Sequence, residues 1–328
     1  MDIRNGKIIM PTIYVPTWTE MYTQAGVGLR GEMEWELFER HNGKEVAVRR
    51  GKQRNLIMDA GIDFWFNDWA TELRQSAKRY MAVGTGTTAP TVSQTILAAQ
   101  LGSRNEWASA PSMAPEGTVP YYSSIVYEFQ EDQANGDLTE WGLFSAATGG
   151  SMWCRELFRD ENGDPVVLTK TDTQVLRFTY KLYIQRAADS STAEITTDGT
   201  THTCTTTINN KQLKYLFAST STDHRLIFGT SNIASDLVND AHNTIKGENI
   251  PVNSYVSKTL SSYMAGSFKR SLEYAIGGSY GNGDIGEAVV IYRHYPLRCI
   301  CRTTYDPVIH KTTSKKLVIG FEISLTRV

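Results

Sequence analysis

Strict alternation of apolar and polar residues is the clearest pattern in this sequence. It is strongest in two long segments, 174–186 and 316–327, and is repeated in the shorter segments 123–130 and 270–277. A period of two is typical of a β-strand with one buried face. In the two long segments the apolar positions are Leu176, Phe178, Tyr180, Leu182 and Ile184, and Leu317, Ile319, Phe321, Ile323 and Leu325.

Several segments recur in the same order at a nearly constant offset. The segment Asn135–Glu140 reads NGDLTE, and NGDIGE follows 147 positions later at Asn282–Glu287. Gly84 and Gly229, each at the end of an apolar strand-like segment, are 145 positions apart, and an Asp-Pro-Val triplet recurs at an offset of 142. Ordered matches at similar offsets indicate an internal duplication.

The duplication predicts an α+β, β-rich fold. We expect two tandem copies of an antiparallel-sheet, sandwich-like module, each with a packed helix. The expected domains are an extended N-terminal arm at 1–30, a first module at 31–186, a Thr/Ser-rich hairpin or linker at 187–208, and a diverged second module at 209–328.

Turn and helix signals fill in the modules. Apolar residues at spacings of four predict an amphipathic helix over 55–73, interrupted or kinked near Gly61, with a shorter counterpart at 211–217. Tight hairpin turns, which favour residues that tolerate positive φ, are expected at four dipeptides. These are Asn42-Gly43, Asn135-Gly136, Asn162-Gly163 and Asp198-Gly199.

Composition narrows the classes of function. The 328 residues are 41% hydrophobic and 21% charged with a net charge of -2, so charge gives no reason to expect specific nucleic-acid or membrane binding. Neither a secretion signal nor a membrane span is expected. The four cysteines lack the spacing of a zinc site, since the nearest pair is Cys299 and Cys301, and no metal or cofactor is expected.

The segment Tyr80–Pro90 contains the spacing G-x-G-x-x-A, which is loosely that of a dinucleotide-binding loop. Such a loop must open a helix within a parallel βαβ unit. Here Pro90 follows at once, and hairpin signals come next. We therefore interpret Gly84 and Gly86 as the link between the helical and sheet parts of a module. Gly84 should occupy a conformation or a close contact that excludes a side chain, with no phosphate-sized site beside it.

Other candidate residues favour structural roles. Glu140 and Glu287 are equivalent in the duplication, and a paired-carboxylate enzyme is the alternative interpretation. Because each glutamate follows its own Asn-Gly turn, a role in fastening that turn or an interface is expected. Trp18, in the expected arm, is the best interface candidate. The sequence offers no Ser/His/Asp or Cys/His arrangement, so no catalytic residue is assigned.

Four segments together resemble virion proteins of tailed bacteriophages. They are Asn55–Asp63, Tyr80–Pro90, Thr95-Ile96-Leu97 and Asn135–Glu140, and the resemblance covers about residues 30–186. It implies an assembly part of a tail, tail fibre or baseplate, and not an enzyme. It also implies threefold or sixfold symmetry about a tail axis.

The expected function is therefore that of a structural component of a bacteriophage particle, in the tail, neck or baseplate. Its expected partners are other virion proteins and copies of itself, as a trimer or hexamer, after synthesis in the host cytoplasm. The alternative is a fibre or adhesin module that binds a host-surface glycan. The structural and interface candidates are Trp18, Gly84, Gly86, Asn135, Gly136, Glu140, Asn282, Gly283 and Glu287.

Overall fold

The structure is a computed structural model of the chain. It describes residues 2–4, 7–9, 18–67, 77–114, 120–186, 190–208, 224–229, 256–260, 262–277, 283–292 and 298–328.

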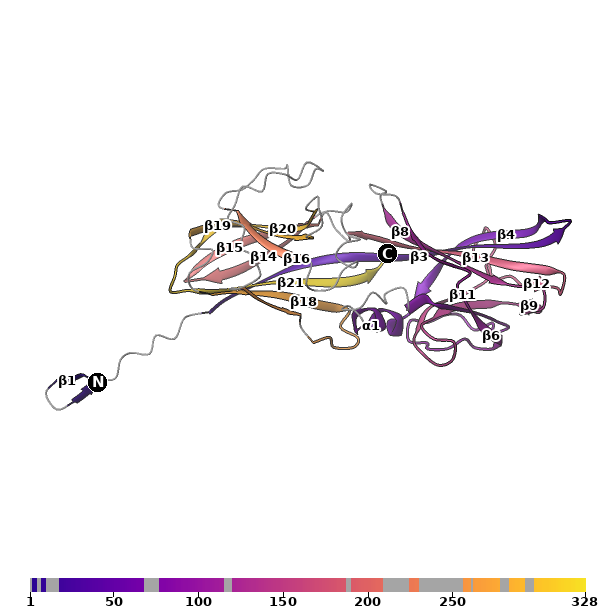
Figure 1. The fold of residues 1–328 in the computed structure, drawn as a ribbon, viewed down its shortest axis with the longest axis horizontal. Coiled ribbons are helices and arrows are strands. Elements are labelled where there is room, and N and C mark those ends of the chain that lie inside the picture. The colour runs from indigo at the N-terminus through magenta and orange to yellow at the C-terminus, as the bar shows by residue number, and fades with distance from the viewer. Residues whose placement is uncertain are drawn as a thin grey trace.

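One strand, β3 (Trp18–His41), runs through the middle of the molecule and joins its two ends (Figure 1). Its first part, 18–29, pairs in parallel with β21 (Lys316–Arg327). Its later part pairs antiparallel with β4 (Lys44–Ile57) on one edge and β13 (Gln174–Arg186) on the other. Strands from both halves of the sequence therefore belong to one sheet.

This sheet has twelve strands, and a separate five-stranded antiparallel sheet contains β14, β15, β20, β19 and β16. Two strand pairs, β1 with β2 and β9 with β12, account for the other strands in the described part of the chain. The other strands of the twelve-stranded sheet are β5 (Tyr80–Gly84), β6 (Gln100–Glu106), β7 (Ser109–Met113), β8 (Tyr121–Phe129), β10 (Glu140–Phe144), β11 (Met152–Leu157), β17 (Val256–Leu260) and β18 (Lys269–Ile276). The remaining bounds are β1 (Asp2–Arg4), β2 (Lys7–Ile9), β9 (Gly136–Leu138), β12 (Leu168–Lys170), β14 (Ser190–Thr197), β15 (Thr200–Ile208), β16 (His224–Gly229), β19 (Gly283–Tyr292) and β20 (Arg298–Lys311).

The expectation of a β-rich, largely antiparallel fold is confirmed, but the α+β description is not. The described residues contain one α-helix, α1 (Asp59–Asn67). It starts later than predicted because β4 continues to Ile57, which pairs with Cys154 of β11. The helix also passes through Gly61 without a break. A side chain there would lie 2.7 Å from the Cα of Trp153, so glycine permits close packing. Residues 68–76 and 209–223 lie outside the described part.

One expected boundary changes, and one open alternative is resolved. Residues 18–30, assigned from the sequence to an extended arm, form the first part of β3, because they pair with a strand about 300 positions away. Such a partner leaves no local signal. The Thr/Ser-rich segment is a hairpin: β14 and β15 meet at Asp198-Gly199, where both residues have positive φ (49° and 76°). The hairpin predicted at Asn42-Gly43 is likewise confirmed between β3 and β4.

The turn at Asn135-Gly136 is not a hairpin. The strand before it, β8, pairs with β13 and β7, whereas the strand after it, β9, pairs with β12. The turn thus carries the chain from one sheet to another. Gly136 has a φ of 130°, which explains why glycine occupies this position. The bend does not determine with which strand β9 pairs.

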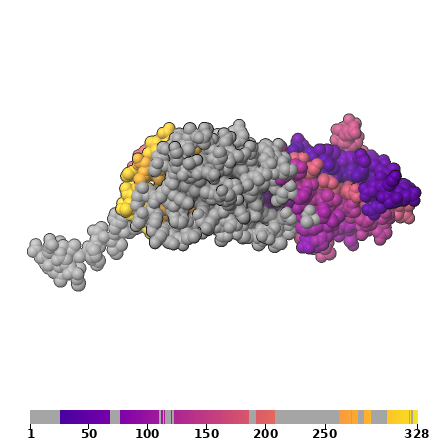
Figure 2. Space-filling view, turned by 45° about the horizontal axis from the view of Figure 1, so that its top comes forward, coloured from indigo at the N-terminus to yellow at the C-terminus, as the bar shows by residue number. Residues whose placement is uncertain are grey.

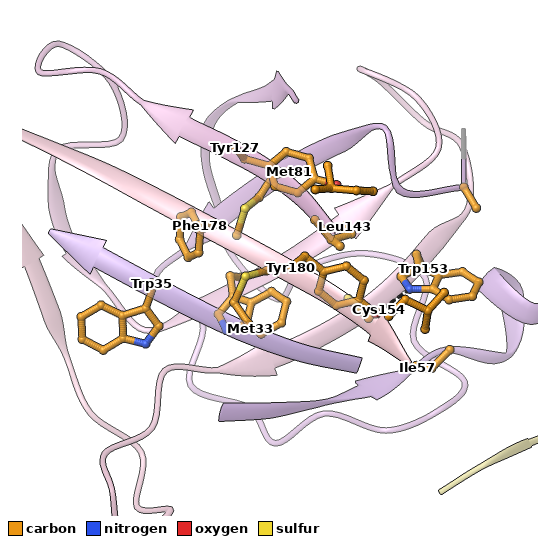
Figure 3. Close-up of a cluster of buried hydrophobic side chains, with 14 of the residues drawn as sticks. Met33, Trp35, Ile57, Met81, Tyr127, Leu143, Trp153, Cys154, Phe178 and Tyr180 are labelled. Atoms are coloured by element: carbon orange, nitrogen blue, oxygen red, sulfur yellow. Dashed lines mark hydrogen bonds between the residues drawn. The ribbon is translucent and has the colours of Figure 1, made fainter. Parts of the chain in front are cut away.

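The largest core lies where β3, β13, β8, β5, β10 and β11 face one another (Figure 3). The predicted inward face of β13 is confirmed, because Leu176, Phe178, Tyr180, Leu182 and Ile184 are all buried. Two polar groups of this core are satisfied within it: Trp153 Nε1 donates to Tyr180 Oη at 2.9 Å, and Tyr127 Oη donates to the carbonyl of Lys78. A second cluster, around Tyr274 and Ile319, lies in the other half.

Lys78 is buried in this core, with its ammonium 5.5 Å from the ring centre of Trp153. Burial lowers the pKa of Lys78 from about 10.5 to about 8. Between these pH values Lys78 binds more protons in the unfolded chain than in the folded chain, so its own contribution to the free energy of unfolding rises with pH across that window, whereas the buried thiol of Cys154, whose pKa is raised, contributes in the opposite direction.

We predict that Lys78→Met removes this rise and stabilises the protein at pH 7, by at most about 3 kcal/mol. Urea unfolding at pH 7 and pH 10 checks it. The exposed Lys44→Met is the control, with the wild-type pH dependence. A Lys78→Met variant that retained the rise would contradict the assignment.

Candidate functional site

The predicted site residue Glu140 is fully buried at the start of β10, and both of its oxygens are used. Oε1 accepts hydrogen bonds from the amides of Gly86 (3.2 Å) and Ala99 (2.7 Å). Oε2 accepts from the amide of Ala98 (3.1 Å) and from Arg155 Nε (2.8 Å) and Nη2 (2.7 Å). Charge-assisted bonds of this kind are stronger than neutral ones.

The sheet register brings this acid and base together. Glu140 is opposite Leu157, and Gly142 is opposite Arg155, so Glu140 and Arg155 are diagonal neighbours on one face of the β10–β11 pair. Arg155, also fully buried, donates from Nη1 to Gln94 Oε1 and from Nη2 to the carbonyl of Thr88, both at 2.8 Å. We call this ion pair with its bonds to the segment 84–100 the first clamp.

The first clamp explains the two glycines. A Cβ on Gly84 would lie 2.4 Å from the carbonyl oxygen of Ala99 and 2.7 Å from Glu140 Oε1. A Cβ on Gly86 would lie 2.4 Å from the same Glu140 oxygen. The predicted exclusion of a side chain at Gly84 is therefore confirmed. The loop does surround an anion, and that anion is the protein's own carboxylate.

An equivalent ion pair is present in the other half. Glu287 of β19 is buried and accepts from Arg302 Nε of β20 at 2.6 Å. Both glutamates precede their arginine by 15 residues. The registers also agree: Glu140 is opposite Gly84, and Glu287 is opposite Gly229. We call this pair the second clamp.

The second clamp has fewer bonds within the described part of the chain. Glu287 Oε1 has no hydrogen-bond partner there, and burial raises the pKa of Glu287 against the opposing effect of Arg302. Residues 230–255, which follow Gly229 as the loop follows Gly84, lie outside the description. Within the described residues, each clamp thus has a buried glutamate, an arginine 15 residues later and a glycine opposite the glutamate.

A buried lysine accompanies each clamp. Lys170 is opposite Gly136, and its ammonium donates to Asn135 Oδ1 (2.7 Å) and to the carbonyl of Gln130 (2.8 Å). Lys311 is opposite Gly283 and donates to the carbonyl of Gly277 at 3.4 Å. Burial lowers the pKa of both lysines. Lys170 thus fastens the turn at Asn135, a role that the sequence interpretation gave to Glu140, whereas Asn282 lies outside the described residues.

The sequence interpretation identified both glutamates but missed their basic partners. A signal was available, because Cys-Arg at 154–155 recurs 147 positions later at 301–302, the same offset as the glutamates. Trp18 lies in β3 opposite Lys316, and its side chain is not described. Among the tryptophan side chains that are described, Trp107 is half-buried and Trp35, Trp65, Trp141 and Trp153 are buried.

This chemistry suits fastening better than reaction, because each clamp carboxylate is enclosed and bonded to a guanidinium. Within the described ranges, no cluster of three or more His, Cys, Asp or Glu side chains is placed to hold a metal ion. Those ranges also contain no helix of the length and apolarity needed to cross a membrane. Comparison with protein-family models, curated proteins and solved structures found no match to this chain.

We predict that Glu140→Gln destabilises the fold by about 3–5 kcal/mol, because it leaves Arg155 buried without its counter-charge and turns an amide NH₂ toward it. The matched control is Glu36→Gln, which breaks the exposed pair with Arg50 and should cost under about 1 kcal/mol. Urea unfolding measures both. Equal effects of the two variants would show that the first clamp does not hold the fold.

Proposed function

We propose that this protein is a structural component of a bacteriophage particle, in the tail, neck or baseplate, and that it acts by subunit assembly. The observation that carries the proposal is the outer part of the β3–β4 hairpin, residues 40–50, which we call the hairpin tip. All eleven of its residues are exposed, and it forms one end of the molecule (Figures 1 and 2).

An exposed two-stranded hairpin is only marginally stable in water by itself. The hairpin tip also presents two valines of β4, Val46 and Val48, each 51% exposed. A partner that covers these valines would bury apolar surface and stabilise the strands. The tip is therefore best explained as a contact surface for another subunit.

The two clamps support a second part of the proposal, that the chain consists of two tandem copies of one module. The same acid–arginine spacing and the same glycine opposite each acid are the support. Duplication gives three chains six similar modules, which suits a trimer on a sixfold axis. A closed ring of six chains is the other arrangement that fits.

The sequence resemblance to tailed-phage virion proteins supports the location in a particle. The alternative, a glycan-binding fibre or adhesin, requires aromatic side chains gathered at the surface. The described tryptophans are in or against the core, so no observation in that part of the chain favours it.

We predict that the purified full-length chain is a trimer or hexamer by light scattering and native mass spectrometry. Val46→Lys with Val48→Lys should shift the population toward monomer, because the charges block burial of the hairpin tip. Val308→Lys, at another exposed valine in the other half, is the control and should assemble normally. A wild-type chain that stays monomeric at high concentration overturns the self-assembly proposal.

A further inference from the structure

One edge of β4 is open along most of its length. On one side, residues 44–55 pair with β3. On the other side, only Leu56 and Ile57 pair, with Arg155 and Cys154 of β11. Within the described residues, the outer edge of 44–55 has no strand partner. An open edge presents backbone donors and acceptors to any extended segment that can reach it.

β4 and β11 diverge beyond their short pairing, and a groove lies between them. The side chain of Gln53 bridges the inner end: its Nε2 donates to the carbonyl of Leu157 at 2.6 Å, and its Oε1 accepts from the amide of Arg159 at 3.0 Å. Outside it, an open groove of about 490 Å³ is lined by 52–56, by Glu156 and by the turn 159–163, which includes Asp160 and Glu161. A neighbouring groove of the same volume shares Lys52 and Glu161, and it extends from 50–52 of β4 across β3 to Arg177 and Thr179 of β13.

On the outer face of the sheet next to this edge, basic residues follow one another along β4 and acidic residues along β3. Arg50, Lys52 and Arg54 of β4 are opposite Glu36, Glu34 and Glu32 of β3. The ion pairs include Arg50 to Glu36 at 2.8 Å and Lys52 to Glu32 at 2.9 Å. Beyond β3, β13 supplies basic residues again, with Lys181 on Glu34 at 2.9 Å. Signs alternate from strand to strand, so the next position outward from β4 is suited to acidic side chains.

The inner side of the edge has a different character. Gly51 has no side chain, and the indole of Trp35 lies directly against it, 2.3 Å from where a Cβ would be. Trp35 also lines the groove beside Gly51. Its Nε1 is buried and has no hydrogen-bond partner within the described part of the chain. A buried donor without an acceptor is costly, so an acceptor from a docked segment would stabilise it.

We propose that the open edge of β4 binds one extended strand of a partner protein, in which Glu or Asp alternates with apolar residues. The acids would lie beside Arg50, Lys52 and Arg54, and the apolar residues would lie on the side of Gly51, against which Trp35 packs. β3 has this pattern at 32–36 (Glu-Met-Glu-Trp-Glu) and occupies the opposite edge of the same strand. The inference rests on the proposed assembly role and specifies the chemistry of one partner.

The test uses the full-length chain and two fluorescein-labelled, capped ten-residue peptides. One alternates glutamate with valine, and the other alternates lysine with valine. Fluorescence anisotropy should show binding of the glutamate peptide, weaker at high salt, and none of the lysine peptide. Hydrogen exchange should show new protection at 50–54 when the glutamate peptide is bound.

Two variants test whether the peptide binds at the open edge of β4. Arg54 has no ion pair in the described residues and is exposed, so Arg54→Glu should leave the fold intact. It should weaken the glutamate peptide roughly fivefold and allow the lysine peptide to bind. Lys269→Glu, which removes a basic residue on β18, is the control and should change neither affinity.

Three results would overturn the inference: no binding of the glutamate peptide, equal binding of both peptides, or no effect of Arg54→Glu. An acidic oligonucleotide that displaces the peptide with equal affinity would also overturn it, since charge alone would then suffice. The proposed function fails separately. A chain that stays monomeric but binds the peptide contradicts self-assembly alone, and an oligomer that ignores the peptide contradicts this inference alone.

Discussion

The ion pair between Glu140 and Arg155 is the interaction on which the surrounding structure depends. Removing two charges from water costs several kcal/mol per ion, and this is recovered only when every lone pair and proton has a partner. Here the partners come from one loop: three backbone amides bind the carboxylate, while Gln94 and Thr88 bind the guanidinium. The loop must therefore close over the pair, which fixes β5, β10 and β11 together.

Because the loop must supply backbone amides to a buried carboxylate, a sequence pattern typical of anion binding occurs here in a largely antiparallel β fold. Glycines in a dinucleotide-binding loop let backbone amides approach a phosphate. Gly84 and Gly86 do the same for a carboxylate, and side chains at either position would collide with it or with the Ala99 carbonyl. The pattern indicated the local geometry correctly. What argued against a nucleotide was the sequence that follows the pattern, namely Pro90 and the hairpin signals.

Sequence reasoning predicted the local features of this fold well, and its failures share one cause. Alternation identified β13 and its buried face, and positive-φ dipeptides identified the turns at Asn42-Gly43 and Asp198-Gly199. The parallel pairing of β3 with β21 was out of reach, because nothing near Trp18 indicates a partner near Lys316. The turn at Asn135 failed likewise, since its residues fix a backbone bend and not the sheet that β9 joins. Of the site, the glutamates were identified, and the recurring Cys-Arg pair at 154–155 could have identified Arg155. That Arg155 contacts Glu140, and that Lys170 contacts the Asn135 turn, becomes recognisable only once strand registers are known.

The basic edge of β4 has a simpler explanation, because charged edges prevent sheets from pairing with copies of themselves. Two β4 strands placed edge to edge would bring like charges together, so the charge does exclude that arrangement. Protection against self-pairing does not explain the residues on the other face of the sheet at this edge. Protection against pairing is best served by a bulky or charged side chain at the middle of the edge, yet Gly51 stands there and leaves Trp35 Nε1 buried without an acceptor. An edge that repels its own copy and lacks one acceptor is suited to a partner of opposite charge, and so the same residues that prevent the wrong pairing select the right one.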